Sequence, residues 1–306
     1  MGSCILVIGL YGQSMLFHVD EFPIDGETVP GDLISIEPGG KGYNQAVSAA
    51  RNNVPVRFIT AVGDDDFGNR LLKDCKTESI DGSYSVTLSR YRTAIASVIS
   101  DKHAYSRIIV SNGACGQFRS EYLLDDAFID CGILLLQLEL PIELALFAAK
   151  KAKENNTFVI LDPAPAQDLP KELVDMVDIV TPNFNEALKL TACSPASSYE
   201  SIATKLHELG YKNVLITLGE NGVYVSLNNG ENYLLSAVDV DAVDTTGAGD
   251  TFNGSLAASL YEGNNIKQSI EIAIAASCLC VTRNGVMESI PYKAEIEKFK
   301  DNLRRM

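Results

Sequence analysis

Two hydrophobic patterns alternate along the chain. Short runs that are apolar at almost every position predict strands buried on both faces, as in a parallel sheet. The ranges between them carry apolar residues at helical spacing and predict helices. The strand ranges are 4–8, 56–62, 133–138, 158–161, 179–180 and 214–218, and the helix ranges are 43–51, 67–73, 142–154, 185–190, 198–209, 250–260 and 266–281. This alternation predicts one domain over residues 1–306, with a mostly parallel sheet between helices in a three-layer α/β/α fold.

Two regions do not fit the alternation. One, at about 11–36, contains turn-forming pairs such as Asp25-Gly26 but no helical pattern. The other, at about 84–111, contains two ranges, 91–98 and 105–110, that are typical of half-exposed antiparallel strands. We expect the two regions to pair as a small sheet at one end of the large one. Because α/β proteins bind ligands at the carboxyl ends of their strands, this sheet would be a lid.

The composition and charge narrow the possible partners. The chain is 46% hydrophobic and 21% charged, as in an ordinary globular protein, and its net charge is −15. Such a charge disfavours nucleic acids and anionic membrane surfaces. No apolar run is long enough to span a membrane, and no signal peptide is recognisable. The seven cysteines lack the spacing of a zinc site, so we expect reduced thiols in a cytoplasmic protein.

A glycine-rich segment before the predicted helix 250–260 carries the most chemistry. It reads Asp244-Thr245-Thr246-Gly247-Ala248-Gly249-Asp250. Glycines at a helix start leave backbone N–H groups open to an anion, and the helix dipole adds positive charge there. A transferring phosphoryl group needs such a cradle, and Asp250 could accept the proton of an attacking hydroxyl. A plain helix N-cap is the alternative interpretation of Asp250.

A second glycine-rich segment precedes an alanine-rich helix. It reads Pro38-Gly39-Gly40-Lys41-Gly42-Tyr43-Asn44 and places polar side chains at one helix terminus. Alone, it could equally be a close-packed turn with a solvated lysine. Neither segment forms a Walker GxxxxGK[ST] motif or a dinucleotide-binding GxGxxG motif, which argues against those two classes of nucleotide site.

Together the two segments resemble the signature regions of the PfkB, or ribokinase-like, family of carbohydrate kinases. Further landmarks follow in family order through most of the chain. They are Gly9, Phe22-Pro23, Gly26-Glu27-Thr28-Val29, Gly63-Asp64-Asp65, Gly68, Gln137-Leu138-Glu139, Asp162-Pro163-Ala164-Pro165, Thr181-Pro182-Asn183, Glu186, Ile216-Thr217-Leu218-Gly219, Val281-Thr282-Arg283, Gly285, Ser289 and Pro291. The resemblance implies a ribokinase-like fold and ATP-dependent phosphorylation of a sugar hydroxymethyl group.

The resemblance also implies roles for individual residues. Asp250 would be the base, and the N–H groups of Gly247, Ala248 and Gly249 would form an anion hole. The residues implied to bind the sugar are Gly12, Ser14, Gly40, Lys41, Asn44, Glu139 and Asp250. Glu139, close before Pro141, could instead be a carboxylate at a helix start, and the Asp64-Asp65-Asp66 run is expected to cap a helix and carry solvated charge.

Cofactor roles follow from the same resemblance. Asn183 and Glu186 would organise the ATP phosphates and the water shell of Mg²⁺, unless Glu186 is simply a solvated helix residue. Thr217, Gly219 and Gly222 would lie along ATP. A monovalent cation, such as potassium, would be bound by Asp244, Thr246, Cys280, Arg283, Gly285 and Ser289.

The chain departs from the family pattern just after Gly9. Members that act on ribose place an Asn and an Asp at the positions held here by Gly12 and Ser14. Losing hydrogen bonds to a buried charged acceptor costs about 1.5–3 kcal/mol each, so ribose is a doubtful substrate. Tyr11, Met15 and Tyr43 would then offer apolar surface to a bulkier or less hydroxylated sugar.

Three functions therefore stay open, and the preferred one is a sugar kinase of unsettled substrate. The first alternative is a nucleoside kinase on the same scaffold, and the second is a non-catalytic nucleotide or sugar sensor. Exposed edges of the lid strands would also allow a homodimer to form through the lid.

Overall fold

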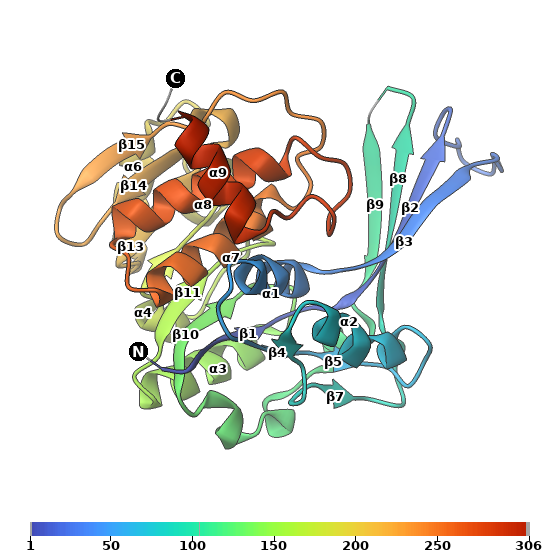
Figure 1. The fold of residues 1–306 in the computed structure, drawn as a ribbon, viewed down its shortest axis with the longest axis horizontal. Helices are drawn as coiled ribbons and strands as arrows, with labels where there is room; N and C mark the ends of the chain where they lie inside the picture. The colour runs from blue at the N-terminus through green and yellow to red at the C-terminus, as the bar shows by residue number, and fades with distance from the viewer. Residues whose placement is uncertain (1, 104, 304–306) are drawn as a thin grey trace.

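A nine-stranded sheet forms the centre of the computed structural model, which describes residues 2–103 and 105–303 (Figure 1). Its strand order is β15-β14-β13-β12-β11-β10-β1-β4-β6. The parallel strands are β1 (Cys4–Ile8), β4 (Val56–Ile59), β6 (Ile80–Asp81), β10 (Cys131–Leu136), β11 (Phe158–Leu161), β12 (Ile179–Val180) and β13 (Asn213–Thr217). Every side chain of β1 is buried, as expected for a strand covered on both faces.

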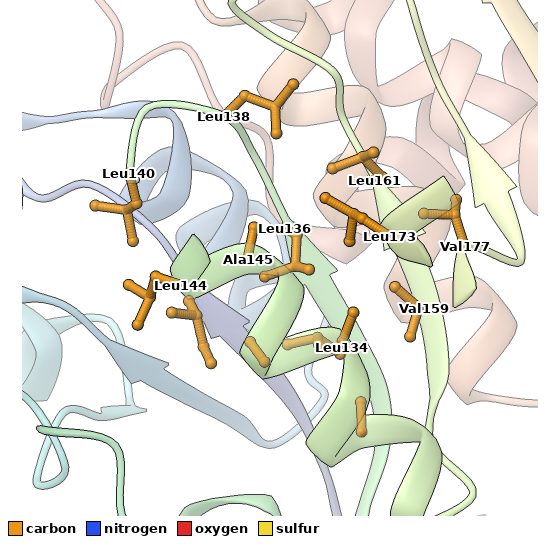
Figure 2. Packing of buried hydrophobic residues seen from close by; sticks show 14 of the residues in the cluster. Leu134, Leu136, Leu138, Leu140, Leu144, Ala145, Val159, Leu161, Leu173 and Val177 are labelled. Carbon is orange, nitrogen blue, oxygen red and sulfur yellow. The ribbon is translucent and has the colours of Figure 1, made fainter. Parts of the chain in front are cut away.

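Helices cover both faces of this sheet. On one face lie α3 (Ile142–Glu154), α4 (Lys171–Met176), α5 (Phe184–Thr191) and α6 (Tyr199–Leu209), packed on side chains such as Leu134 and Val159 (Figure 2). On the other lie α1 (Lys41–Arg51), α2 (Leu71–Thr77), α7 (Ala248–Tyr261), α8 (Ile266–Cys280) and α9 (Lys293–Leu303). The predicted three-layer α/β/α class is confirmed.

Several elements differ from the predicted ones. The range 56–62 divides at Thr60 into β4 and β5 (Ala61–Val62), and β5 leaves the large sheet to pair with β7 (Val86–Thr87). The pattern also missed α4, α9 and an antiparallel pair at the sheet edge, β14 (Val223–Ser226) and β15 (Asn232–Leu235). Helix α9 buries little more than Ile296, so its apolar signal is weak.

Smaller features complete the fold. The predicted helix over 67–73 begins as a 3-10 turn, Gly68–Arg70, before α2. Three further 3-10 turns, Gly113–Gln117, Ser120–Tyr122 and Asp125–Phe128, connect the small sheet to β10. Within the described ranges, the helices are all too short or too polar to cross a membrane.

A second sheet stands beside the large one (Figure 1). Its order is β3-β2-β8-β9, with β2 (Gly12–Val19), β3 (Asp32–Gly39), β8 (Ala94–Asp101) and β9 (Ser106–Ser111). The two regions that broke the α/β alternation thus pair with each other, through a parallel contact of β2 with β8 between two antiparallel hairpins. Both edge strands expose large apolar side chains, including Ile34 at 64% and Ile109 at 69% exposure.

Asp65 anchors the entry to this second sheet. Its carboxylate accepts hydrogen bonds from the N–H of Thr93 at 2.9 Å, from Thr93 Oγ1 at 2.7 Å and from the N–H of Gly68 at 2.9 Å. Burial would raise the pKa of Asp65, but these donors outweigh it and lower the pKa. Asp64 and Asp66 are exposed, so the expectation of solvated charge holds for them and is wrong for Asp65.

Candidate active site

Polar side chains gather at the carboxyl ends of the parallel strands. Gln137 and Glu139 follow β10, Asp162 follows β11, and Thr181 follows β12. The amino ends of α1 and α7 meet the same edge, because Gln45 of α1 donates both to Asp162 after β11 at 2.7 Å and to Asp250 in the first turn of α7 at 3.1 Å. This edge is where open α/β sheets bind ligands.

Asp250 lies in the first turn of α7, but it does not cap the helix. The N-cap is Gly247, whose φ of 79° is left-handed, and Asp250 points back to α1. Its Oδ2 accepts from Nδ2 of Asn44 at 2.9 Å, and its Oδ1 accepts from Nε2 of Gln45 at 3.1 Å. The side chain is only 5% exposed. The alternative interpretation of Asp250 as a plain N-cap is therefore wrong.

The first turn of α7 presents backbone N–H groups beside this carboxylate. Ala248 donates to the carbonyl of Thr245 at 3.3 Å, whereas the residues described by the structure offer no acceptor to the N–H groups of Gly249 and Asp250. A Cβ on Gly249 would meet no atom within 4 Å, so open space lies in front of it. Free N–H groups at a helix start can bind an anion. Among the described residues, the N–H of Gly247 also has no acceptor, so two of the three predicted groups, Gly247 and Gly249, are open, and Asp250 adds a third.

The start of α1 is built by close backbone approaches. Gly40 has a φ of 107°, and a Cβ there would lie 2.5 Å from the carbonyl oxygen of Leu10. A Cβ on Gly42 would lie 2.5 Å from Cα of Gly9. The backbone N–H of Lys41 then reaches Oε2 of Glu139 at 2.8 Å. Glycine is needed here for packing, and that packing brings Lys41 and Glu139 to the site.

Charge is concentrated around Lys41. The neighbouring Asp250 carboxylate raises the pKa of the Lys41 ammonium, so Lys41 stays charged. Burial raises the pKa of Glu139 to about 7 and that of Asp162 to about 8. Near neutral pH, Asp162 is therefore mostly protonated and Glu139 is balanced between its two forms. The Lys41 ammonium therefore lies among carboxyl groups, two of which, Glu139 and Asp162, have raised pKa values.

The predicted nucleotide residues lie at the ends of β12 and β13. Asn183 Oδ1 accepts from the N–H of Glu186 at 2.9 Å, while Glu186 Oε2 accepts from the N–H of Asn183 at 2.8 Å, which makes a capping box for α5. Burial raises the pKa of Glu186. Glu186 is half-buried, so it is not the freely solvated residue of the alternative interpretation.

A cavity of about 280 Å³ opens beside this capping box. Asn183, Thr217 and Gly219 line it, together with the ring of Tyr199. Gly222 does not line it. A Cβ there would lie 2.0 Å from the carbonyl oxygen of Leu235, so its glycine serves the close approach of β15, and its place along ATP stays a prediction.

A side-chain link joins the two halves of the site. Thr181 Oγ1 donates to Oδ1 of Asn253 at 2.6 Å, and Nδ2 of Asn253 donates to the carbonyl oxygen of Gly249 at 3.0 Å. The end of β12, which carries Asn183, is thereby tied to the first turn of α7, which carries Asp250.

The predicted cation residues are only partly brought together. Cys280 Sγ lies 3.2 Å from Ser289 Oγ and 3.9 Å from the carbonyl oxygen of Thr246. The N–H of Asp244 donates to the carbonyl of Val281 at 3.2 Å. The side chain of Arg283 instead forms an ion pair with Glu295. Gly285 turns the following loop with a φ of 84°.

Strand β2 carries Gly12 and Ser14, the two positions at which the chain departs from the family pattern. A Cβ on Gly12 would lie 2.4 Å from the carbonyl oxygen of Ala94, so the neighbouring strand excludes a larger residue. Ser14 pairs across the sheet with Glu37 of β3. Glu37 is half-buried, burial raises its pKa, and the N–H groups of Val286 and Met287 donate to it. A carboxyl group thus stands opposite the short hydroxyl.

The predicted apolar surface for the substrate is wrong for two of its three residues. Tyr11 is 0% exposed and Tyr43 is 1% exposed, with their rings in edge contact at 5.2 Å. The hydroxyl of Tyr11 donates to Asp74 at 2.6 Å, away from the strand ends. Both tyrosines belong to the core under α1. Met15 is half-buried.

Sequence reasoning assigned no role to three buried polar residues at the centre of the site. Gln45, Gln137 and Asp162 are all less than 5% exposed, and Gln45 contacts both Asp162 and Asp250. A signal was present, because Gln45 adjoins Asn44 and the other two lie in recognisable landmarks. Their contacts span long sequence separations and could not be read locally.

Comparison with known proteins places these features in one family. The model of the pfkB family carbohydrate kinases matches residues 5–293. The ribokinase of Haemophilus influenzae is 36% identical over 99% of this chain and 100% of its own, and the deoxyribokinase of Salmonella typhi is 30% identical over 98% of each. The structure of Arabidopsis thaliana ribokinase complexed with ribose and ATP superposes with a TM-score of 0.89 at 28% identity, over 98% of this chain and 99% of its own.

Proposed function

The chain belongs to the PfkB family of carbohydrate kinases, and from that premise we propose that Asp250 is the base with which it phosphorylates a sugar hydroxymethyl group. The enzyme is an ATP-dependent sugar kinase. The observation that carries the role of Asp250 is its geometry: a buried carboxylate held by two amide donors, one residue from open N–H groups at a helix start.

The reaction follows from this arrangement. The Asp250 carboxylate accepts the hydroxyl proton, the sugar oxygen forms a bond to the γ-phosphorus, and the bond from that phosphorus to the ADP oxygen breaks. The open N–H groups of Gly247, Gly249 and Asp250 stabilise the charge on the transferred phosphoryl oxygens. Lys41, kept charged by Asp250, adds positive charge, and Lys41, Asn44 and Glu139 hold the sugar hydroxyls.

ATP would extend from this point along the strand ends. We place its phosphates beside Asn183, Thr217 and Gly219, which line the cavity near α5. Within the described ranges, no group of three acidic, histidine or cysteine side chains is arranged to hold a metal. The single Glu186 carboxylate and the nucleotide phosphates would suit Mg²⁺, an ion that keeps several of its waters. Held there, Mg²⁺ would supply positive charge to the phosphate oxygens.

At the end of the sugar site near the second sheet, positions 12 and 14 themselves offer less hydrogen bonding than the residues near Asp250, and the Glu37 carboxyl opposite Ser14 already accepts from the N–H groups of Val286 and Met287. Gly12 offers no side chain and cannot be enlarged, and Ser14 offers one hydroxyl. We therefore place at this end a sugar position with few hydroxyl groups, as in a deoxypentose or a sugar derivative. Among the relatives are both ribokinases and deoxyribokinases. No contact in the structure specifically favours a nucleoside.

The base role is tested by Asp250→Asn. This change keeps the shape of the side chain and removes its ability to accept a proton, so turnover should fall at least about 100-fold while ATP still binds. ADP release measures turnover, and calorimetry measures ATP binding. Wild-type turnover in the variant would rule out Asp250 as the base.

The substrate and the cation are tested by a panel of pentoses, deoxypentoses, hexoses and nucleosides, assayed with and without potassium. We expect a deoxypentose or derivative to give a higher kcat/KM than ribose. Thr246, Cys280 and Ser289, which lie together behind the first turn of α7, support a monovalent cation that would raise activity. A preference for nucleosides over free sugars would overturn the sugar assignment. Equal rates in sodium and in potassium would overturn the proposed activation by a monovalent cation.

We propose that the second sheet acts as a lid, because the chain segments that connect it to the large sheet lie beside the site. Its edge strands β3 and β9 expose Ile34 and Ile109, and we propose that they pair two chains as a homodimer.

All seven cysteines are free thiols, which fits the reducing cytosol, where we place the enzyme.

A further inference from the structure

One buried amide joins the two carboxyl groups at the centre of the site. Nε2 of Gln45 lies 2.7 Å from Oδ2 of Asp162 and 3.1 Å from Oδ1 of Asp250. A primary amide has two N–H hydrogens, so each carboxyl group can receive one. Gln45 is 0% exposed, and no bulk solvent competes for these hydrogen bonds.

The orientation of this amide is determined by a second glutamine. Nε2 of Gln137 donates to Oε1 of Gln45 at 2.6 Å. If the Gln45 amide were reversed, its oxygen would face Oδ1 of the Asp250 carboxylate, which has no hydrogen to donate, and its nitrogen would face the N–H donor of Gln137, so both contacts would be repulsive. Only one orientation of Gln45 is therefore compatible with its neighbours.

The backbone around Gln137 limits where this second amide can lie. A Cβ on Gly9 would lie 2.2 Å from Oε1 of Gln137, so the glycine after β1 makes room for it. Gln137 itself is 2% exposed. The chain of contacts thus runs from a strand end, through two buried amides, to Asp250.

We propose that Gln45 is a positioning residue that fixes the Asp250 carboxylate for proton abstraction, with Gln137 and Asp162 fixing the orientation of its amide. The inference rests on the base role proposed above. Asn44 holds Oδ2 and Gln45 holds Oδ1, so the carboxylate cannot rotate about its terminal bond without breaking both hydrogen bonds. A base fixed in this way needs no reorientation when the sugar hydroxyl arrives.

Replacing Gln45 removes one of the two amide donors to the Asp250 carboxylate. Other titratable groups face Asp250 from each neighbouring element, and they stay in place when Gln45 is changed. They are Lys41 on α1, Glu139 after β10, Asp162 after β11, Glu186 on α5 and Cys280 on α8. A shift that appears on changing Gln45 alone can therefore be assigned to its amide.

The test is the pH dependence of kcat/KM in Gln45→Met and Gln45→Glu. Methionine matches the length of glutamine and donates no hydrogen bond. The acid limb of the profile, where kcat/KM falls at low pH, should therefore move to higher pH by about 0.5–1 unit. Glutamate adds a negative charge beside Asp250, so its limb should move further. In both variants kcat should fall about 10-fold or more, with the KM for ATP within about 2-fold of the wild-type value.

Ser48→Ala is the matched control, because it removes hydrogen bonds between α1 and α7 one turn further along, to Thr251 and Ser255. It should lower the melting temperature and leave the acid limb in place. If Gln45→Met does not fold, Gln137→Met tests the same series of hydrogen bonds, because it removes the donor to Oε1 of Gln45. The acid limb should then move in the same direction by a smaller amount.

An unshifted acid limb in the Gln45 variants, or a shift of equal size in Ser48→Ala, would overturn the positioning role. That outcome with an inactive Asp250→Asn would leave the base role intact. An active Asp250→Asn would instead remove the premise itself, so the two failures are distinguishable.

Discussion

At the scale of single residues, Asp162 is a buried carboxyl group whose folded and unfolded acidities differ. Burial raises its folded pKa to about 8, whereas an unfolded aspartate has a pKa of about 4. Between these values the folded chain holds a proton that the unfolded chain has released. The contribution of Asp162 to stability is therefore lost progressively as pH rises from about 4 to about 8.

Asp162→Asn should remove this pH dependence. The asparagine Oδ1 can still accept from Gln45, and no charge has to be buried. We expect the melting temperature of the variant to match the wild-type value near pH 5 and to exceed it by about 2–6 °C at pH 8. Differential scanning calorimetry at the two pH values measures the difference.

A matched control is Asp25→Asn in an exposed loop, which should change neither melting temperature. If Asp162→Asn and wild type differ by the same amount at pH 5 and pH 8, the raised pKa of Asp162 is contradicted.

At the scale of elements, the connection into β8 depends on one carboxylate. Asp65 receives three hydrogen bonds from Thr93 and Gly68, and Thr93 directly precedes β8. Asp65→Ala leaves the buried Thr93 donors without an acceptor, at a cost of about 2–3 kcal/mol. Strand β8 should then be less well fixed. With the second sheet acting as the proposed lid, the KM for the sugar should rise more than the KM for ATP.

Thermal unfolding and steady-state kinetics check this prediction, with a loss of about 3–5 °C in melting temperature expected. The control is Asp64→Ala, since Asp64 is exposed and adjoins Asp65. Equal effects of the two changes would show that the hydrogen bonds of Asp65 do not hold the lid.

At the scale of the whole molecule, the small sheet leaves apolar side chains on both its edges in contact with water. Ile34 and Ile109 are more than half exposed, which is unfavourable for a chain that stays monomeric. We expect sedimentation velocity to give the mass of a dimer. Ile109→Lys should shift the distribution toward monomer, because a buried, unpaired ammonium group opposes association.

Leu124→Lys makes the same change at an exposed site just before the 3-10 turn Asp125–Phe128, outside the strands of both sheets, and should leave the dimer intact. A wild-type chain that sediments as a monomer at micromolar concentration would rule out the lid dimer.

The fold class could be predicted because its signals are local. Runs such as β1 and β11 are apolar at nearly every position, and this pattern alone distinguishes a doubly covered strand from one with a solvated face. The edge pair β14 and β15 and the helix α9 were missed for the converse reason. Their half-exposed positions carry little hydrophobic signal, and the large sheet and its helices hold them in place.

For the site, the sequence alone predicted the proposed phosphoryl-transfer centre, because glycines before a helix leave backbone N–H groups open to an anion and Asp250 adjoins them. Only the tertiary structure decided what surrounds it. Asp250 meets Gln45 across 205 positions, and Gln45 meets Asp162 across 117. Packing of α1 on α7 makes the first contact, and packing of α1 on the large sheet makes the second. The packing of α1 on the sheet also buries Tyr11 and Tyr43, which the sequence had assigned to the substrate. Residue type and spacing specify local geometry, but the partner of a buried polar group depends on which elements pack together.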